Sequence, residues 1–240
     1  MTINVSGSAP VGQIGFDFSP KWEPFDRTIA EQIARFVRNV VWDNVDKLTS
    51  SGLGLFGINS SAVGLCHIIN AVGAAALREI VSENVTMHVQ PVVARWVIIS
   101  PSEEEVGVLS WGDDVSILDG RFHAVVACID HDKIYDENGV KMFPVALVDF
   151  ALSDVVTQFQ SKGGPNKLAV NGELFCSWDN FGVDAPSAVY MPPKNLVESA
   201  QLLEQVLEQD DKAIQAMGKI VVREYRRAKS PFWLGWLPSR

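Results

Sequence analysis

Cysteine is scarce in this chain. Three cysteines, Cys66, Cys128 and Cys176, occur among 240 residues. An odd number of cysteines cannot pair completely, and no two of them have the CxxC spacing of a metal or redox motif. These absences exclude a disulfide-rich scaffold and predict a reducing compartment, which we expect to be the cytoplasm.

Long apolar runs and clustered positive charge are also lacking. No uninterrupted apolar run reaches the roughly 18 residues of a membrane span, and residues 1–18 lack the basic start and apolar stretch of a signal peptide. The formal net charge is -9, whereas nucleic-acid binding requires clustered Lys and Arg. The one dense basic cluster, within residues 223–229, suits the carbonyl end of a helix. We therefore expect neither a membrane nor a nucleic acid as partner.

The composition is that of an ordinary globular protein, with 47% hydrophobic and 20% charged residues. A chain of this length can bury one sizeable core. We predict a single domain over residues 1–240, with two small lobes as the alternative. Within it, residues 1–24 form an irregular lead-in, and residues 195–240 form a C-terminal helix and tail.

Two helices are predicted in the first third of the chain. Residues 28–48 have apolar side chains at helical spacing, and Thr28 with Glu31 has the pattern of a capping box. Residues 62–81 are apolar nearly all round and rich in Ala, which predicts a helix buried on most sides. Cys66 lies in the first turns of this second helix.

The signal then changes to β. Residues 85–100, 121–130 and 141–152 are rich in Val, Ile and Phe and are separated by turn-prone stretches. The pair Asn138-Gly139 is a hairpin signal, so we expect the second and third runs to form an antiparallel pair. The order helix, buried helix, antiparallel sheet, helix predicts an α+β fold. Further short strands are predicted at residues 167–169, 174–178 and 188–191.

Three residues in this layout have the chemistry of a nucleophilic enzyme. A reactive thiolate is favoured at a helix N-terminus and beside an imidazole that a third group orients. Cys66 begins a helix, His123 begins the second β run, and Asp149 lies near the end of the third. Pairing of these runs would bring His123 and Asp149 to the same end of adjacent strands. Asp154 and Asn180 remain alternatives to Asp149.

A known family shares this layout. The helix opened by Cys66, the run ALREIVSENVTMHVQPVVARWVII, the strand that begins HAVV and the strand that ends in VDF resemble the papain-like fold of transglutaminase-like proteins and arylamine N-acetyltransferases. The resemblance covers residues 57–151. It implies the catalytic order Cys, His, Asp, with the cysteine at a helix N-terminus and the other two on neighbouring antiparallel strands.

The chain also departs from that family. His67 follows the nucleophile where many relatives have an aromatic residue, and the approach INSSAVGLC lacks the Gln that supplies an oxyanion donor in papain-like peptidases. Asn59 and Ser60 are candidates for that donor, beside the backbone N–H of the nucleophile. Trp111 and Trp178 are candidates for lining the cleft, although such residues more often pack in a core or a lid.

The resemblance implies thiol-dependent acyl transfer or amide hydrolysis, as in peptidases, amidases, deamidases and transglutaminases. The expected substrate is a peptide, a protein or a small amide or acyl compound, with no cofactor and no metal. The alternative is a catalytically inactive papain-like scaffold that binds or regulates a protein, with Cys66 as a small core residue. A zinc site at Cys66 and His67 would need a second ligand pair that the sequence does not offer. No oligomeric state can be read from the sequence.

Overall fold

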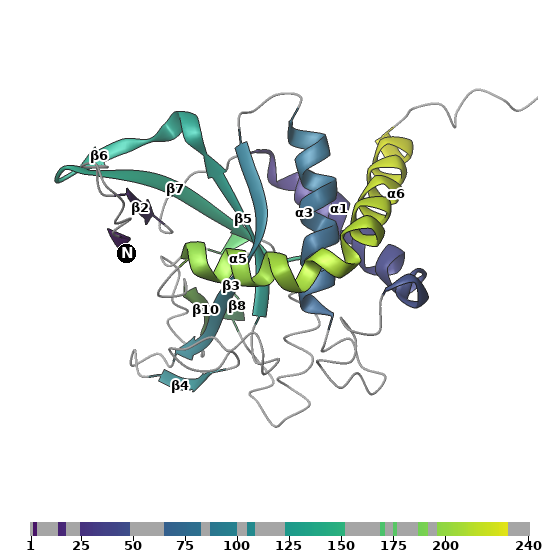
Figure 1. The fold of residues 1–240 in the computed structure, drawn as a ribbon, viewed down its shortest axis with the longest axis horizontal. Helices are drawn as coiled ribbons and strands as arrows, with labels where there is room; N and C mark the ends of the chain where they lie inside the picture. Colours follow the sequence, from purple (N-terminus) through teal and green to yellow (C-terminus); the bar gives the residue numbers. More distant parts are fainter. Residues whose placement is uncertain are drawn as a thin grey trace, which may run out of the picture.

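A β-sheet with helices packed against it forms the centre of the computed structural model (Figure 1). The architecture is mixed α and β, which is compatible with the predicted α+β class. None of the described helices combines the length and apolar character that a membrane crossing requires. The structure describes residues 2–3, 14–17, 25–48, 65–82, 87–99, 105–108, 123–151, 169–170, 175–176, 187–191 and 196–229.

The first long helix, α1 (Arg27–Trp42), is amphipathic, and its start differs from the prediction. The residue that caps it is Asp26, whose side-chain oxygen accepts a hydrogen bond from the Thr28 N–H at 2.9 Å. The predicted capping box of Thr28 and Glu31 is therefore wrong, since the aspartate already satisfies this donor.

The end of α1 is also earlier than predicted. The helix stops at Trp42, and a 3-10 turn, η1 (Val45–Lys47), follows. The side chain of Asn44 explains this end, because its amide donates to the Val40 carbonyl at 2.7 Å. Asparagine side chains that bond to the main chain in this way compete with continued helix.

The second helix, α3 (Cys66–Val81), is buried on most sides, as the sequence predicts. It contacts the sheet on one side and two helices, α1 and α6 (Asp211–Lys229), on another. Its alanines favour helix and allow neighbouring elements to approach closely. A Cβ atom on Gly218 of α6 would lie 2.8 Å from the Ala75 Cβ atom, so these two helices pack with little space between them.

The sheet has the strand order β1-β2-β7-β5-β3-β10-β8, with β4 beside β3, and with β6 and β9 beside β7. Every residue of the central strand β5 is buried, which accounts for its continuous apolar run. The strands are β1 (Thr2–Ile3), β2 (Ile14–Asp17), β3 (Met87–Ile99), β4 (Glu105–Val108), β5 (His123–Asp130), β6 (Tyr135–Glu137), β7 (Val140–Val148), β8 (Ala169–Val170), β9 (Phe175–Cys176) and β10 (Ser187–Met191).

The predicted antiparallel pairing of the second and third β runs is confirmed: β5 pairs with β7, with Val126 opposite Val148. The Asn138-Gly139 turn, however, joins β6 to β7. Both turn residues have positive φ, 56° and 82°, as a tight two-residue hairpin requires. Between β5 and β6 the chain makes the short 3-10 turn η4 (His131–Lys133).

Two further expectations need correction. The sheet is mixed rather than antiparallel, because β2 runs parallel to β7 and β8 runs parallel to β10. The strands β1 and β2 lie within the segment 1–24 that was predicted to be irregular.

The C-terminal helical segment is divided into α5 (Leu196–Leu207), the 3-10 turn η5 (Glu208–Asp210) and α6. In Figure 1, α5 and α6 point in clearly different directions.

The packing of α3 on Phe150, two residues after the end of β7, gives a stability prediction. Gly73 faces Phe150 so closely that a Cβ atom would overlap the ring. A Gly→Ala change inside a helix ordinarily stabilises by ~1 kcal/mol. We expect Gly73→Ala instead to lower the free energy of unfolding by about 1–3 kcal/mol, through overpacking. Denaturant titration measures this, and adding Phe150→Ala should remove part of the overlap penalty. A single variant as stable as the wild type would contradict the packing described.

Candidate active site

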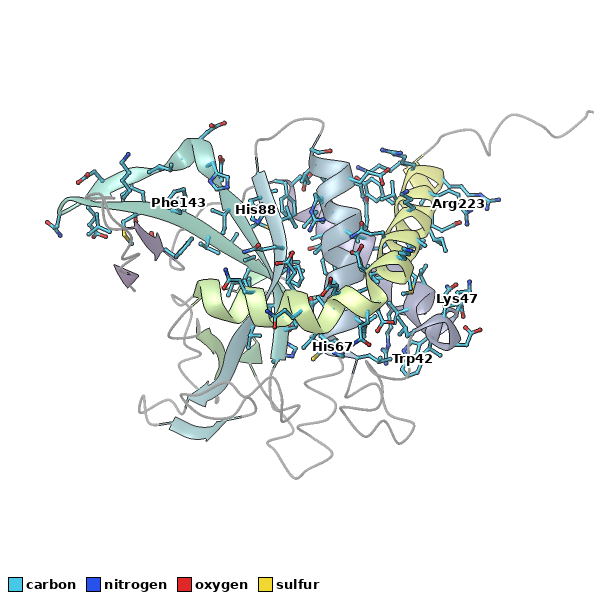
Figure 2. All side chains as sticks on the ribbon, viewed as in Figure 1. Trp42, Lys47, His67, His88, Phe143 and Arg223 are labelled. Atoms are coloured by element: carbon cyan, nitrogen blue, oxygen red, sulfur yellow. The ribbon has the colours of Figure 1, made fainter. Side chains whose placement is uncertain are left out.

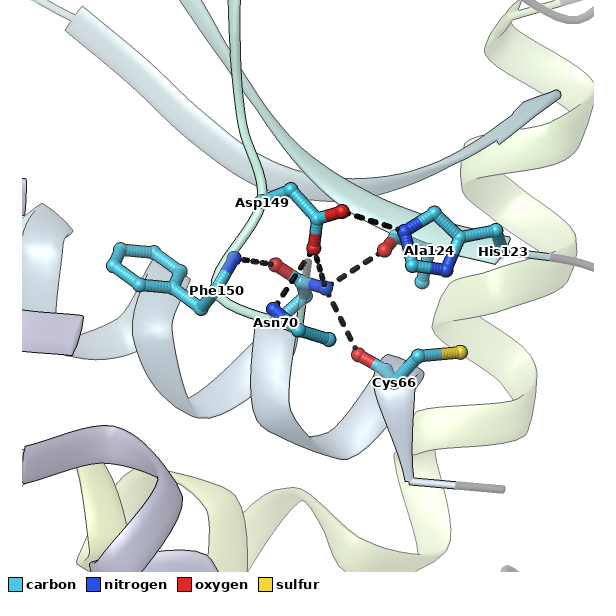
Figure 3. A network of polar contacts seen from close by, with 7 residues as sticks. Cys66, Asn70, His123, Ala124, Asp149 and Phe150 are labelled. Carbon is cyan, nitrogen blue, oxygen red and sulfur yellow. Dashed lines mark hydrogen bonds and ion pairs between the residues drawn. The ribbon is translucent and has the colours of Figure 1, made fainter. Parts of the chain in front are cut away.

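A buried histidine–carboxylate pair lies where β5 begins and β7 ends. His123 is the first residue of β5, and Asp149 follows the last residue of β7. The His123 Nε2 and Asp149 Oδ2 atoms are 2.7 Å apart (Figure 3). The exposed fractions of these residues are 5% and 0%. The structure thus places these two predicted site residues in direct contact, at the same end of neighbouring antiparallel strands.

The third predicted residue, Cys66, opens α3 and is partly buried. Its thiol interacts with His123, which lowers the pKa of the thiol. Because Nε2 of this histidine binds Asp149, the nitrogen left for the sulfur is Nδ1, which lies on the cysteine side of the ring (Figure 3). The residue that precedes the helix, Leu65, provides no side-chain cap. Because Cys66 is the first residue of α3, its thiol lies at the positive end of the helix dipole, next to an imidazole.

Asp149 is held at both carboxylate oxygens. While Oδ2 faces His123, Oδ1 accepts hydrogen bonds from the Ala151 N–H at 2.8 Å and from the Asn70 side-chain amide at 3.1 Å. Three donors thus surround a fully buried carboxylate. Hydrogen bonds of this kind favour the ionised form of a carboxylate and fix its plane.

Asn70 is a site residue that the sequence did not reveal. It lies one turn after Cys66 on α3 and is completely buried. Besides Asp149, its amide lies within hydrogen-bonding distance of the Cys66 carbonyl, at 3.1 Å, and the Ala124 carbonyl, at 2.7 Å. Its side-chain oxygen accepts from the Phe150 N–H at 2.9 Å. The signal in the sequence is one polar residue within the otherwise apolar stretch 68–77.

The surroundings of Cys66 change its acidity in opposing ways. Burial by itself would raise the pKa of the Cys66 thiol, but hydrogen bonds and charge from His123 and from His67 outweigh it and lower the pKa to about 6. Cys128, buried in β5, has only the burial effect, and its pKa is raised. The difference between these two cysteines therefore arises from the imidazoles.

The pKa of His123 is shifted upward, opposite to the shift of the Cys66 pKa. Burial would lower its pKa, but the charge and hydrogen bond of Asp149, together with the interaction with Cys66, raise the pKa to about 10. Between about pH 6 and about pH 10 the favoured state of the pair is a thiolate beside an imidazolium. The two groups titrate as a coupled pair, and each stabilises the charge of the other.

His67 is a second histidine that interacts with Cys66. It follows Cys66 in α3, is 1% exposed, and interacts with the thiol. Figure 2 shows it at one end of α3, whereas His88 lies beside the sheet near the opposite end of that helix. His88 pairs with Ile129 at the end of the β3–β5 ladder away from His123. Among the histidines, His67 and His123 are the two that interact with the Cys66 thiol.

Several predicted candidates fall outside the part of the chain that the structure describes. These are the oxyanion candidates Asn59 and Ser60, the cleft candidates Trp111 and Trp178, and the alternative orienting residues Asp154 and Asn180. Within the described ranges, no group of three or more His, Cys, Asp or Glu residues has the arrangement of a metal site.

Comparison with known proteins gives little. No protein-family model matches the chain, and no curated protein matches it significantly. One solved structure, described only as the crystal structure of a genomics target, is 12% identical with a TM-score of 0.46. That alignment covers 88% of this chain and 86% of the other. A likeness this distant carries no information about function.

The two imidazoles at the thiol give a prediction about reactivity. Alkylation of Cys66 by iodoacetamide should rise with pH around a midpoint of about 6. His67→Phe should move this midpoint upward, and His123→Ala should move it further, because His123 is the stronger of the two influences. Mass-spectrometric mapping follows the label, and the buried Cys128 should stay unlabelled as an internal control. An unchanged midpoint in His67→Phe would exclude its contact with the thiol.

Proposed function

We propose that this protein is a papain-like cysteine enzyme, similar in layout to transglutaminase-like proteins and arylamine N-acetyltransferases, that catalyses acyl transfer or amide hydrolysis. One observation carries the proposal: the buried His123–Asp149 pair, with 2.7 Å between Nε2 and Oδ2, leaves the other imidazole nitrogen for the Cys66 thiol. A nucleophile, a base and an orienting carboxylate in this relation are the working parts of covalent catalysis. The position of Cys66 as the first residue of α3 supports this assignment, because the start of a helix favours the thiolate form.

The first half of the reaction forms an acyl-enzyme. The Cys66 thiolate attacks the carbonyl carbon of an ester, thioester or amide, and a carbon–sulfur bond forms. The bond to the leaving group breaks as His123 donates the Nδ1 proton to that group. Asp149 keeps the imidazole in one orientation and stabilises its charge in the state before this transfer.

The second half releases the acyl group. Water or an amine attacks the thioester while His123 accepts a proton from it at Nδ1. The new carbon–oxygen or carbon–nitrogen bond forms, the carbon–sulfur bond breaks, and the thiolate–imidazolium pair is restored. Hydrolysis and transfer use the same three residues and differ in which acceptor the site admits.

The negative charge that develops on the carbonyl oxygen needs hydrogen-bond donors. The backbone N–H of Cys66 is one candidate, because it belongs to the first turn of α3, where N–H groups point out of the helix. Asn59 and Ser60 remain candidates for the second donor. Peptides, proteins and small amide or acyl compounds are the proposed substrate class.

An activated ester tests the proposal. With p-nitrophenyl acetate we expect a burst of nitrophenolate of about one equivalent and an acetyl group on Cys66, detected by mass spectrometry of the intact protein and its peptides. His123→Ala should slow acylation by about 10²–10⁴-fold, because the base is lost. Cys66→Ala should abolish the adduct.

A matched control is His88→Ala, which removes an exposed histidine whose partner is Gln90, at 2.7 Å. This variant should acylate at the wild-type rate. A folded wild-type protein without an adduct on Cys66, or an adduct that forms equally fast in His123→Ala, would contradict the proposal. The inactive binding scaffold would then be the better description.

A further inference from the structure

A single buried amide joins the three segments that carry Cys66, His123 and Asp149. Asn70 donates to the carbonyl of Cys66 on α3, to the carbonyl of Ala124 on β5, and to the Asp149 carboxylate after β7. The respective distances are 3.1, 2.7 and 3.1 Å. Ala124 directly follows His123 in the chain. One side chain therefore contacts all three parts of the proposed active site (Figure 3).

The orientation of the Asn70 amide follows from its partners. The side-chain oxygen faces the Phe150 N–H, which can only donate, and the nitrogen faces three oxygens. Turning the amide over would place its oxygen against acceptors and its nitrogen against a donor. Its two hydrogens serve three oxygens, so one N–H is shared. The amide thus has one favourable orientation.

Helix geometry explains part of why a side chain at position 70 can contact all three segments. Residues four apart lie on one face of a helix, so Asn70 lies directly above the Cys66 carbonyl. Gly73, one turn further on, lacks the Cβ atom that would overlap Phe150. The segment that begins at Asp149 thus packs on this face of α3. Asn70 accepts a hydrogen bond from the Phe150 N–H, and Gly73 leaves space for the Phe150 ring.

The hydrogen bond from Asn70 restricts the orientation of the Asp149 carboxylate. Asn70 and the Ala151 N–H both bind Oδ1, which leaves Oδ2 directed at His123. Without the amide, one neutral N–H remains on Oδ1, and the carboxylate gains freedom to rotate. His123 Nε2 would then lose its fixed acceptor, and the ring would no longer hold its Nδ1 atom toward the sulfur.

We propose that Asn70 is a positioning residue of the active site, which acts through Asp149 to fix the tautomer and orientation of His123. This inference rests on the proposed function, since it assigns a role in the same reaction. It goes beyond the triad, because the partners of Asn70 are main-chain groups and the Asp149 carboxylate rather than the Cys66 sulfur. Its effect on the reaction passes entirely through the carboxylate and the main chain.

The imidazole itself gives the sharpest test. In a Cys66→Ala background, nitrogen-15 NMR of His123 reports the hold of Asp149 on the ring without any contribution from the thiolate. We expect neutral His123 to carry its proton on Nε2, and its pKa to stay above the ordinary value for histidine. Adding Asn70→Ala should give a mixture of tautomers and lower this pKa by about one unit or more, since the carboxylate is no longer fixed.

Asn44→Ala is the matched control. Asn44 is also a buried asparagine whose amide bonds a carbonyl four residues earlier, at 2.7 Å, but it lies after α1. Its loss should cost stability and leave the His123 signals unchanged. Asn70→Ser leaves space for a water at the Phe150 N–H, and it serves as a second variant with the same expected NMR result.

The outcomes separate this inference from the proposed function. A folded Asn70 variant with wild-type His123 tautomer and pKa would overturn the positioning role, whether or not Cys66 forms an acyl-enzyme. Failure of both Asn70 variants to fold, with Asn44→Ala folded, would overturn it too, because Asn70 would then be a folding requirement. Altered His123 signals alongside a wild-type protein that forms no acyl-enzyme would support the inference and refute only the proposed chemistry.

Discussion

The hydrogen bond between His123 Nε2 and Asp149 Oδ2 is the interaction on which the site depends. At 2.7 Å and with almost no solvent exposure, it places a charged pair inside the protein. Such a pair is tolerated only when its remaining donors and acceptors are satisfied. The adjacent strands β5 and β7 bring the two residues together, and the face of α3 that carries Asn70 supplies further hydrogen bonds. Sheet pairing and helix packing are thus both needed for one contact.

Opposing electrostatic effects determine the pKa values of the groups in the site. Burial disfavours the charged form of every group there, and yet the Cys66 thiol has a pKa lowered to about 6, while His123 has one raised to about 10. Each charge is matched by a neighbour: the thiolate by imidazoles, the imidazole by Asp149, and the carboxylate by N–H donors. Cys128 shows what burial does without such neighbours, since its pKa moves upward.

The candidate site residues that the sequence predicted are those whose signals are local. Cys66 at the start of an Ala-rich helix and His123 at the start of an apolar strand could be identified from their own surroundings. The contact with Asp149 followed from strand pairing, although the turn joins β6 rather than β5 to β7.

Asn70 could not be found in this way. Its partners Ala124, Asp149 and Phe150 are 54, 79 and 80 residues away in sequence, and nothing in the sequence specifies that such a contact forms. The parallel pairing of β2 with β7 was missed for the same reason, because a four-residue strand separated from its partner by more than a hundred residues has no local signal.

The most direct test of the central claim is an ultraviolet titration of the Cys66 thiolate, taken as the difference between the wild type and Cys66→Ser. A thiolate–imidazolium pair predicts one absorbance step with a midpoint of about 6. His123→Ala should shift that step to higher pH. A wild-type midpoint near the ordinary cysteine value of about 8.5 would contradict the claim that His123, held by Asp149, activates Cys66.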